Sequence, residues 1–209
     1  MTTSGSAPEH PHSWRGHDFD FTGVTFDGGD FSRAVFSGTV DFSQAVFSSG
    51  MVDFEQTVFD GKVFFTDAEF SGGRVDFTRS ESCGRLAGFM KASFSGSYVA
   101  FHETVFSRGT ADFTAGTFSE GSVYFHRAEF SGGRVLFHLA EFEGGEVDFS
   151  GANFYDDRVD FGMAQFTGGT VIFLGAMGSA PARLTELARS PASLPTGLVL
   201  PSYWYTTGP

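Results

Sequence analysis

The stretch that decides the fold is Val147–Arg158, which reads V-D-F-S-G-A-N-F-Y-D-D-R. Its two Phe residues, Phe149 and Phe154, lie five positions apart, and each follows a small or β-branched residue by two positions. Residues two apart share one face of an extended backbone. Each Phe is therefore predicted to point inward beside its Val or Ala, and the residue between them, such as Asp148, to point outward.

This unit repeats along most of the chain. All 28 Phe residues lie between Phe19 and Phe173, and from Phe77 onward the pattern returns every 12 residues as alternating intervals of five and seven. The longer interval usually holds a Gly pair, such as Gly132-Gly133, and Gly accepts the positive φ of a tight corner. Short strands with regular turns and an inward Phe predict a β-solenoid, in which each rung is stabilised by stacking on its neighbours.

A central Phe with a small residue two positions earlier resembles the repeat of the pentapeptide-repeat family, A-(D/N)-(L/F)-X-X. The resemblance covers Phe19–Phe173. It implies an all-β fold, a right-handed quadrilateral β-helix with four five-residue sides per coil. The two-residue insertions are a departure, and they predict about 24 residues per coil with bulged corners on two opposite edges. A flattened solenoid of 12 residues per coil is the alternative, although the strict spacing of five from Phe21 to Phe36 favours the square form.

The flanks differ from the repeats. We expect a flexible N-terminal lead over residues 1–18, the solenoid over 19–174, and a C-terminal capping helix and apolar tail over 175–209. A helix is predicted over Ser179–Arg189, with Ser179 as the N-cap and Pro181 in the first turn. The residues expected to cap the solenoid or to form a homodimer are Leu184, Leu187, Tyr203 and Trp204.

One repeat is interrupted, because Ser82 stands where a Phe is expected. The 12-residue period is kept across it, so one side of the coil is substituted without an insertion. This side is either a locally weakened or bulged face or a recognition loop. The adjacent Cys83 is the only cysteine. An intrachain disulfide and a multi-cysteine metal site are thereby excluded.

Composition restricts the function. The 13 basic and 25 acidic residues give a net charge of −12, which argues against direct binding to nucleic acid or to an anionic membrane. No secretory signal, membrane span, phosphate-binding loop or nucleophile elbow is present in the sequence. We expect a cytoplasmic protein that needs no cofactor and carries no catalytic residue.

Two groups of residues are candidates for a site. The first is the outward acidic set, expected to bind a protein partner: Asp76, Asp112, Asp148, Asp160, Glu129 and Glu141. The second is a weaker ligand patch of His102, Tyr124 and His126, which a 24-residue coil would bring together. Surface polarity inherited from the repeat is the simpler interpretation of both groups.

Three functions follow in order of preference. Some pentapeptide-repeat proteins are acidic rods that mimic DNA in the DNA-binding saddle of type II topoisomerases such as gyrase, and the resemblance implies that role here, with a possible homodimer through the C-terminal segment. The alternative is an interaction scaffold without a topoisomerase role, for which outward Tyr124, Leu136 and Ile172 are candidates. A ligand-binding or enzymatic site around the His residues is the remote alternative.

Overall fold

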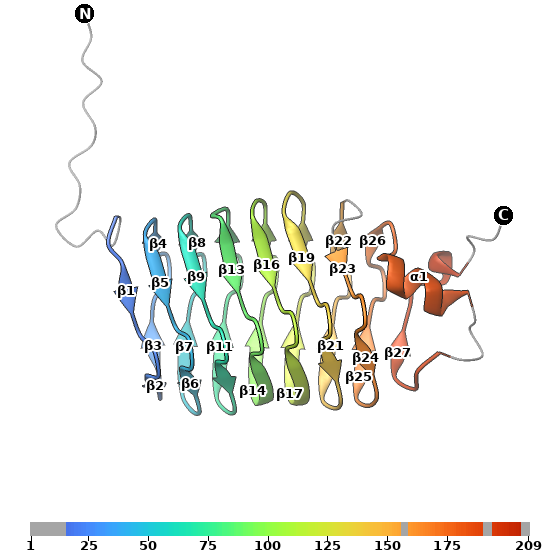
Figure 1. Cartoon of the computed structure of the whole chain (residues 1–209), viewed down its shortest axis with the longest axis horizontal. Helices are drawn as coiled ribbons and strands as arrows, with labels where there is room; N and C mark the ends of the chain where they lie inside the picture. The colour runs from blue at the N-terminus through green and yellow to red at the C-terminus, as the bar shows by residue number, and fades with distance from the viewer. Residues whose placement is uncertain (1–15, 156–158, 190–193, 206–209) are drawn as a thin grey trace, which may run out of the picture.

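The computed structural model describes residues 16–155, 159–189 and 194–205. Residues 1–15, most of the predicted N-terminal lead, lie outside the described residues. The chain forms a rod of stacked coils with strand β1 (Phe19–Asp20) at one end and helix α1 (Ala182–Ala188) at the other (Figure 1). No described helix has the length and apolar character needed to cross a bilayer.

Each coil has four short strands, and each strand pairs in parallel with the equivalent strand of the next coil. Face 1 consists of β1, β5 (Thr39–Asp41), β9 (Lys62–Phe64), β13 (Leu86–Gly88), β16 (Thr110–Asp112), β19 (Arg134–Leu136) and β23 (Val159–Asp160). Face 2 consists of β2 (Thr25–Phe26), β6 (Val46–Phe47), β10 (Glu69–Phe70), the first halves of β14 (Ser93–Ala100) and β17 (Thr117–Tyr124), β20 (Glu141–Phe142) and β24 (Gln165–Phe166).

Face 3 consists of β3 (Gly29–Asp30), β7 (Met51–Asp53), β11 (Arg74–Asp76), the second halves of β14 and β17, β21 (Glu146–Asp148) and β25 (Thr170–Ile172). Face 4 consists of β4 (Val35–Phe36), β8 (Val58–Phe59), β12 (Glu81–Ser82), β15 (Val105–Phe106), β18 (Glu129–Phe130), β22 (Asn153–Phe154) and β26 (Met177–Gly178). The predicted four-sided solenoid is confirmed, with seven coils in the described residues.

Strand register fixes the size of a coil. On face 1, Ala87 pairs with Ala111 and Ala111 with Val135, so one coil has the length that the sequence predicts. Earlier in the rod, Val40 pairs with Val63, and the coil there is one residue shorter. The flattened alternative, with half as many residues per coil, is wrong because Phe77 and Phe89, half a coil apart, follow strands of different faces.

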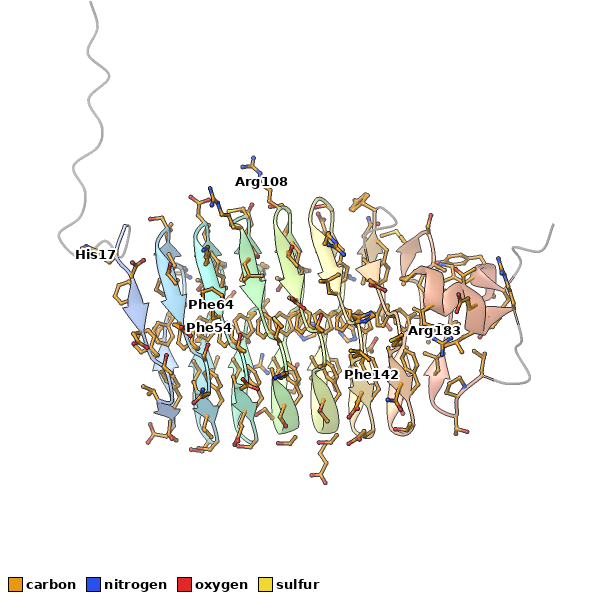
Figure 2. The ribbon with its side chains drawn as sticks, in the orientation of Figure 1. His17, Phe54, Phe64, Arg108, Phe142 and Arg183 are labelled. Atoms are coloured by element: carbon orange, nitrogen blue, oxygen red, sulfur yellow. The ribbon has the colours of Figure 1, made fainter. Side chains whose placement is uncertain are left out.

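The core consists of Phe columns along the rod, drawn in Figure 2 as a row of stacked rings. On face 1, Phe65 and Phe89 stack with ring centroids 4.7 Å apart, one coil from the next. Phe65 also meets Phe77 of face 3 edge to face at 5.6 Å. Both arrangements suit the quadrupole of aromatic rings. The Val or Ala two positions before each Phe is buried beside it in most repeats, as predicted.

The short corners are type II turns. After Phe77, the N–H of Ser80 donates to the Phe77 carbonyl at 3.0 Å, and Arg79 between them has φ 55°. A positive φ at this turn position is what a type II turn requires. The same arrangement follows the inward Phe residues of faces 1 and 3 along the rod.

The long corners depend on Gly because successive coils touch there. A Cβ at Gly144 would overlap the Ser119 carbonyl oxygen of the previous coil, and one at Gly84 would overlap that of Gly61. These corners lie between faces 2 and 3 and between faces 4 and 1, which are opposite edges, as predicted.

The Ser82 interruption leaves a hole in the Phe column of face 4. Ser82 pairs in register with Phe59 and Phe106, and it is buried. A cavity of about 10 Å³ lies there, lined by these Phe rings and by the hydroxyl-bearing Ser80 and Thr104. The Cys83 thiol beside it is half-buried, and burial, then Glu81 and Asp60, raise its pKa. A raised pKa disfavours the reactive thiolate.

The C-terminal helix is shorter than predicted. It spans Ala182–Ala188, and its N-cap residue is Pro181, without a side-chain capping bond. The assignment of Ser179 as N-cap is wrong because Pro181 has an extended backbone, with ψ 143°, so the helix can begin only after it. After the helix, β27 (Leu198–Val199) pairs with β25, and the 3₁₀ turn η2 (Ser202–Trp204) follows.

Candidate functional site

The six acidic residues predicted to bind a partner surround the rod instead of forming one column. They lie on face 1 (Asp112, Asp160), face 2 (Glu141), face 3 (Asp76, Asp148) and face 4 (Glu129). On face 3, Asp76 has Asp53 on one side and Ala100 on the other, so the Asp series is interrupted. Any surface that binds the acids of one face meets only a subset of them.

Asp residues that directly precede an inward Phe have a structural role. The Oδ1 atom of each accepts a hydrogen bond from the backbone N–H two residues later, at 2.6–2.9 Å. They are Asp20, Asp30, Asp41, Asp53, Asp76, Asp112, Asp148 and Asp160. This Asx arrangement holds the chain at the start of these eight turns. The recurring Asp-Phe pair at the turn was the sequence signal for it.

Asp76 and Asp148 point away from the core, as predicted, but they are only 7% and 8% exposed. Arg74 covers Asp76, with Nη2 at 2.5 Å from Oδ2, and His126 covers Asp148, with Nε2 at 2.7 Å from Oδ2. Burial would raise the pKa of Asp76, but hydrogen bonds from Thr78 and Arg74 outweigh it and keep the pKa below the usual 3.8. Only a small part of each carboxylate is therefore accessible to a partner.

Freely exposed negative charge lies elsewhere. Four Glu residues are exposed and make no ion pair with any described residue: Glu69, Glu120, Glu129 and Glu143. Of these, only Glu129 is among the predicted site residues. Sequence reasoning passed over Glu120 and Glu143 because they lie in the long corners and not in the Val-Asp-Phe strand positions.

The 24-residue coil brings the predicted ligand patch together on face 3. The rings of His102 and His126 lie 5.0 Å apart, and Tyr124 lies 5.7 Å from His102 and 5.2 Å from His126. Tyr98 extends the cluster, with its Oη 3.2 Å from His102 Nε2 and the Arg74 guanidinium 4.4 Å from its ring. His138 lies apart on face 1, 3.8 Å from Asp160.

A surface depression of about 480 Å³ adjoins the patch, lined by His102, Glu103, His126, Arg127, Ser150 and Gly151. Burial, then the neighbouring His126, hold the pKa of His102 below the usual 6.5. No three His, Cys, Asp or Glu side chains of the described chain are placed to hold a metal ion together. The arrangement suits stacking and hydrogen bonding.

The four residues predicted to cap or dimerise differ in burial. Leu184 is fully buried, Leu187 packs partly buried against the core, and Trp204 is 4% exposed. The Trp204 ring lies 5.6 Å from Phe173, and its Nε1–H donates to the Gly178 carbonyl at 3.3 Å. Tyr203 is 48% exposed. Three of the four thus pack against the solenoid of their own chain.

Comparison with known proteins identifies the repeats. The family model described as pentapeptide repeats (9 copies) matches residues 21–68 and, in an overlapping second match, residues 31–81. The inward Phe spacing seen there continues through the later coils. No curated protein sequence matches the chain significantly.

Solved structures of QnrB1, a plasmid-mediated fluoroquinolone resistance protein, are similar only distantly. A trypsin-treated point variant is 17% identical over 85% of this chain and 98% of its own, with a TM-score of 0.27. The full-length form is 14% identical over 85% of this chain and 97% of its own, with a TM-score of 0.23. At these values neither likeness carries an argument about function.

Proposed function

This chain belongs to the pentapeptide-repeat family, and on that premise we propose that it is a non-catalytic cytoplasmic protein whose acidic rod binds a basic protein surface in place of DNA. The partner we propose is a type II topoisomerase such as gyrase, which the rod would inhibit or protect. The observation that carries the proposal is the charge of the solenoid, with 22 acidic and 10 basic residues between Phe19 and Phe173.

The charge density of the solenoid is a little over half that of B-DNA. Seven coils at about 4.8 Å each make a rod of about 34 Å, so the net charge amounts to about one per 3 Å, beside one per about 1.7 Å along B-DNA. Exposed Glu69, Glu120, Glu129 and Glu143 carry part of this charge without a cationic neighbour in the described chain. A basic saddle would supply the missing partners.

The test is inhibition of gyrase supercoiling across a protein titration at low and moderate salt. A variant with Gln at Glu69, Glu120, Glu129 and Glu143 should lose inhibition, since it keeps the fold and removes unpaired charge. The control carries Gln44→Glu and Gln165→Glu, which add charge at exposed positions. It should inhibit at least as well as the wild type. Absence of inhibition by the wild type at tens of micromolar contradicts the topoisomerase proposal.

An interaction scaffold is the second candidate, favoured by outward Tyr and Ile side chains on face 3. Tyr124 and Ile172 occupy one column, with Asp148 between them, while Leu136 lies on face 1. A contact through such residues would respond weakly to salt, whereas a DNA mimic would respond strongly. The homodimer through the C-terminal segment stays a prediction, which light scattering of the purified protein would test.

A further inference from the structure

The rod is not uniformly acidic, because one long corner carries a row of basic residues. Lys62, Arg85, Arg108 and Arg134 lie in four successive turns of the solenoid, at the corner between faces 4 and 1. This corner is the upper edge in Figure 1, and Figure 2 shows Arg108 projecting from it. All four side chains are exposed. We call them the basic ridge.

Within residues 16–155, 159–189 and 194–205, no carboxylate lies within ion-pair distance of a ridge residue. The salt bridges of the described chain use Arg74, Arg79, Arg127 and Arg183, and none uses a ridge residue. The carboxylates of Asp18 and Asp60 border one shallow depression with Lys62 and Arg85 without pairing with them.

The opposite long corner, between faces 2 and 3, has the reverse character. It carries Asp27, Glu120, Glu143 and, at the start of β21, Glu146. Arg74, at the start of β11, is its single cation among the described residues, and it is already paired with Asp76. Unpaired positive charge is therefore a property of the ridge and not of long corners in general.

Apolar side chains accompany the ridge on face 1. Phe64, Leu86 and Leu136 occupy outward positions of β9, β13 and β19, and each is half-buried. Phe64 lies over Gly88, where an added Cβ would meet its ring at 3.6 Å. Asp112 is the one acid among them, in β16. The basic ridge and these three apolar residues together form what we call the basic–apolar strip.

We propose that the basic–apolar strip binds an acidic amphipathic polypeptide segment of a second protein. The four ridge cations make no ion pair with a described residue, although the chain has a net charge of −12, so they attract a negatively charged partner. The adjoining Phe and Leu side chains are stabilised by apolar contact, which a phosphodiester backbone does not offer. A long polyanion would also be repelled by the rest of the rod. This surface has the opposite chemistry to the acidic surface of the proposed function and does not depend on it.

The length of the ridge suits a short polypeptide segment. Successive coils are spaced as closely as the Phe65 and Phe89 rings, 4.7 Å, so the ridge covers three coil steps, or about 14 Å. An extended segment of about four residues covers that length, and a helix needs about ten. The partner segment therefore needs about three or four carboxylates along one side, with apolar residues beside them.

The experiment uses fluorescence anisotropy with the full chain and a labelled model peptide of about 15 residues, with Leu at helical i, i+3, i+4 spacing and Glu elsewhere. The test variant is Arg108→Glu with Arg134→Glu, and a second is Phe64→Ser with Leu136→Ser. The control is Arg33→Glu with Lys91→Glu, which makes the same charge change at exposed residues outside the strip. Circular dichroism verifies that each variant keeps the wild-type fold.

We expect the ridge variant to weaken peptide binding at least tenfold, the apolar variant at least threefold, and the control less than twofold. A peptide with Gln in place of Glu should bind at least tenfold more weakly. The proposal is overturned if the wild type does not bind the peptide at 1 mM, or if the control variant loses as much as the ridge variant. Tighter binding of a DNA duplex or of phosphatidylserine vesicles than of the peptide also overturns it.

Discussion

An Asp that directly precedes an inward Phe, as eight of them do, has two properties that the sequence alone does not separate. It contributes negative charge, and its Oδ1 accepts a backbone N–H at the start of the turn, as Asp41 does from Ser43 at 2.8 Å. A hydrogen bond to a charged group is worth about 1.5–3 kcal/mol when buried and less when exposed to water. Where Asp is present, it therefore supports its turn whatever the rod binds.

Substitution at Asp41 separates these two properties. Asp41→Ala removes the acceptor and should lower the free energy of unfolding by about 0.5–1.5 kcal/mol. Asp41→Asn keeps an Oδ1 acceptor and removes the charge, so it should change that free energy by less than about 0.5 kcal/mol. Urea denaturation followed by circular dichroism measures both. Equal losses in the two variants would mean that charge, and not the hydrogen bond, stabilises the turn.

His102 should make folding stability depend on pH. Burial and His126 lower its pKa from 6.5, so the folded state favours the neutral imidazole. The stability that neutral His102 contributes is fully present above pH 6.5, and it is lost as the pH falls through the folded-state pKa because the unfolded state binds the proton more tightly. Proton NMR should show His102 titrating below 6.5. A His102→Gln variant should lose part of the decline in melting temperature between pH 7 and 5, and an unchanged decline would contradict the assignment.

At the scale of the element, the Phe columns should be most sensitive in the middle of the rod. Phe137 is fully buried between Phe113 and Phe161, with ring centroids 4.8 and 4.7 Å away. Phe137→Ala should therefore cost about 3–5 kcal/mol. Phe166, in the last coil, is only half-buried and stacks on Phe142 of the coil before it. Phe166→Ala should cost clearly less in the same urea denaturation, and equal costs would argue against the column as the stabilising unit.

Ser82 offers the reverse experiment within a column. Its backbone keeps the register of Phe59 and Phe106, but the cavity beside it is only about 10 Å³, far smaller than a phenyl ring. Ser82→Phe should therefore lower the free energy of unfolding by about 1–3 kcal/mol through overpacking, whereas Ser82→Ala should be nearly neutral. Thermal and urea unfolding of both variants test this. Stabilisation by Ser82→Phe would mean that the neighbouring Phe rings move apart and admit a ring into the column.

The strands and corners were predictable because they depend on local spacing. Phe149 and Phe154, five apart, define two inward positions, and the Gly-Gly intervals mark the corners where coils touch. The burial of Asp148 under His126 was not predictable from local spacing. His126 lies in the neighbouring coil, so the number of residues per coil decides whether the two side chains meet. The lengthening of the coil by one residue, just after the Ser82 interruption, decides which side chains become neighbours.

At the scale of the whole molecule, the rod has two chemically different long edges. The corner between faces 2 and 3 carries net negative charge, and the basic ridge runs along the opposite corner. A rod with this distribution approaches a basic partner with the ridge turned away. An acidic partner is attracted to the ridge, whereas Glu120 and Glu143, two of the four Glu residues changed in the topoisomerase test, lie on the opposite corner.

The caps at the ends of the rod should stabilise mainly the coils next to them. In a solenoid each coil contacts only its neighbours, so loss of a terminal cap weakens the nearest coils first. Trp204 covers Phe154 and Phe173 at the C-terminal end of the rod. In Trp204→Ala, amide hydrogen exchange should accelerate in β25 and β26 and stay unchanged in β9 and β13. Tyr155→Ala is the control, because the Tyr155 ring is 54% exposed and its loss should leave exchange in the last coil near the wild-type rate. Uniform acceleration along the rod in Trp204→Ala would instead show that the solenoid unfolds as one cooperative unit, with the cap contributing to every coil.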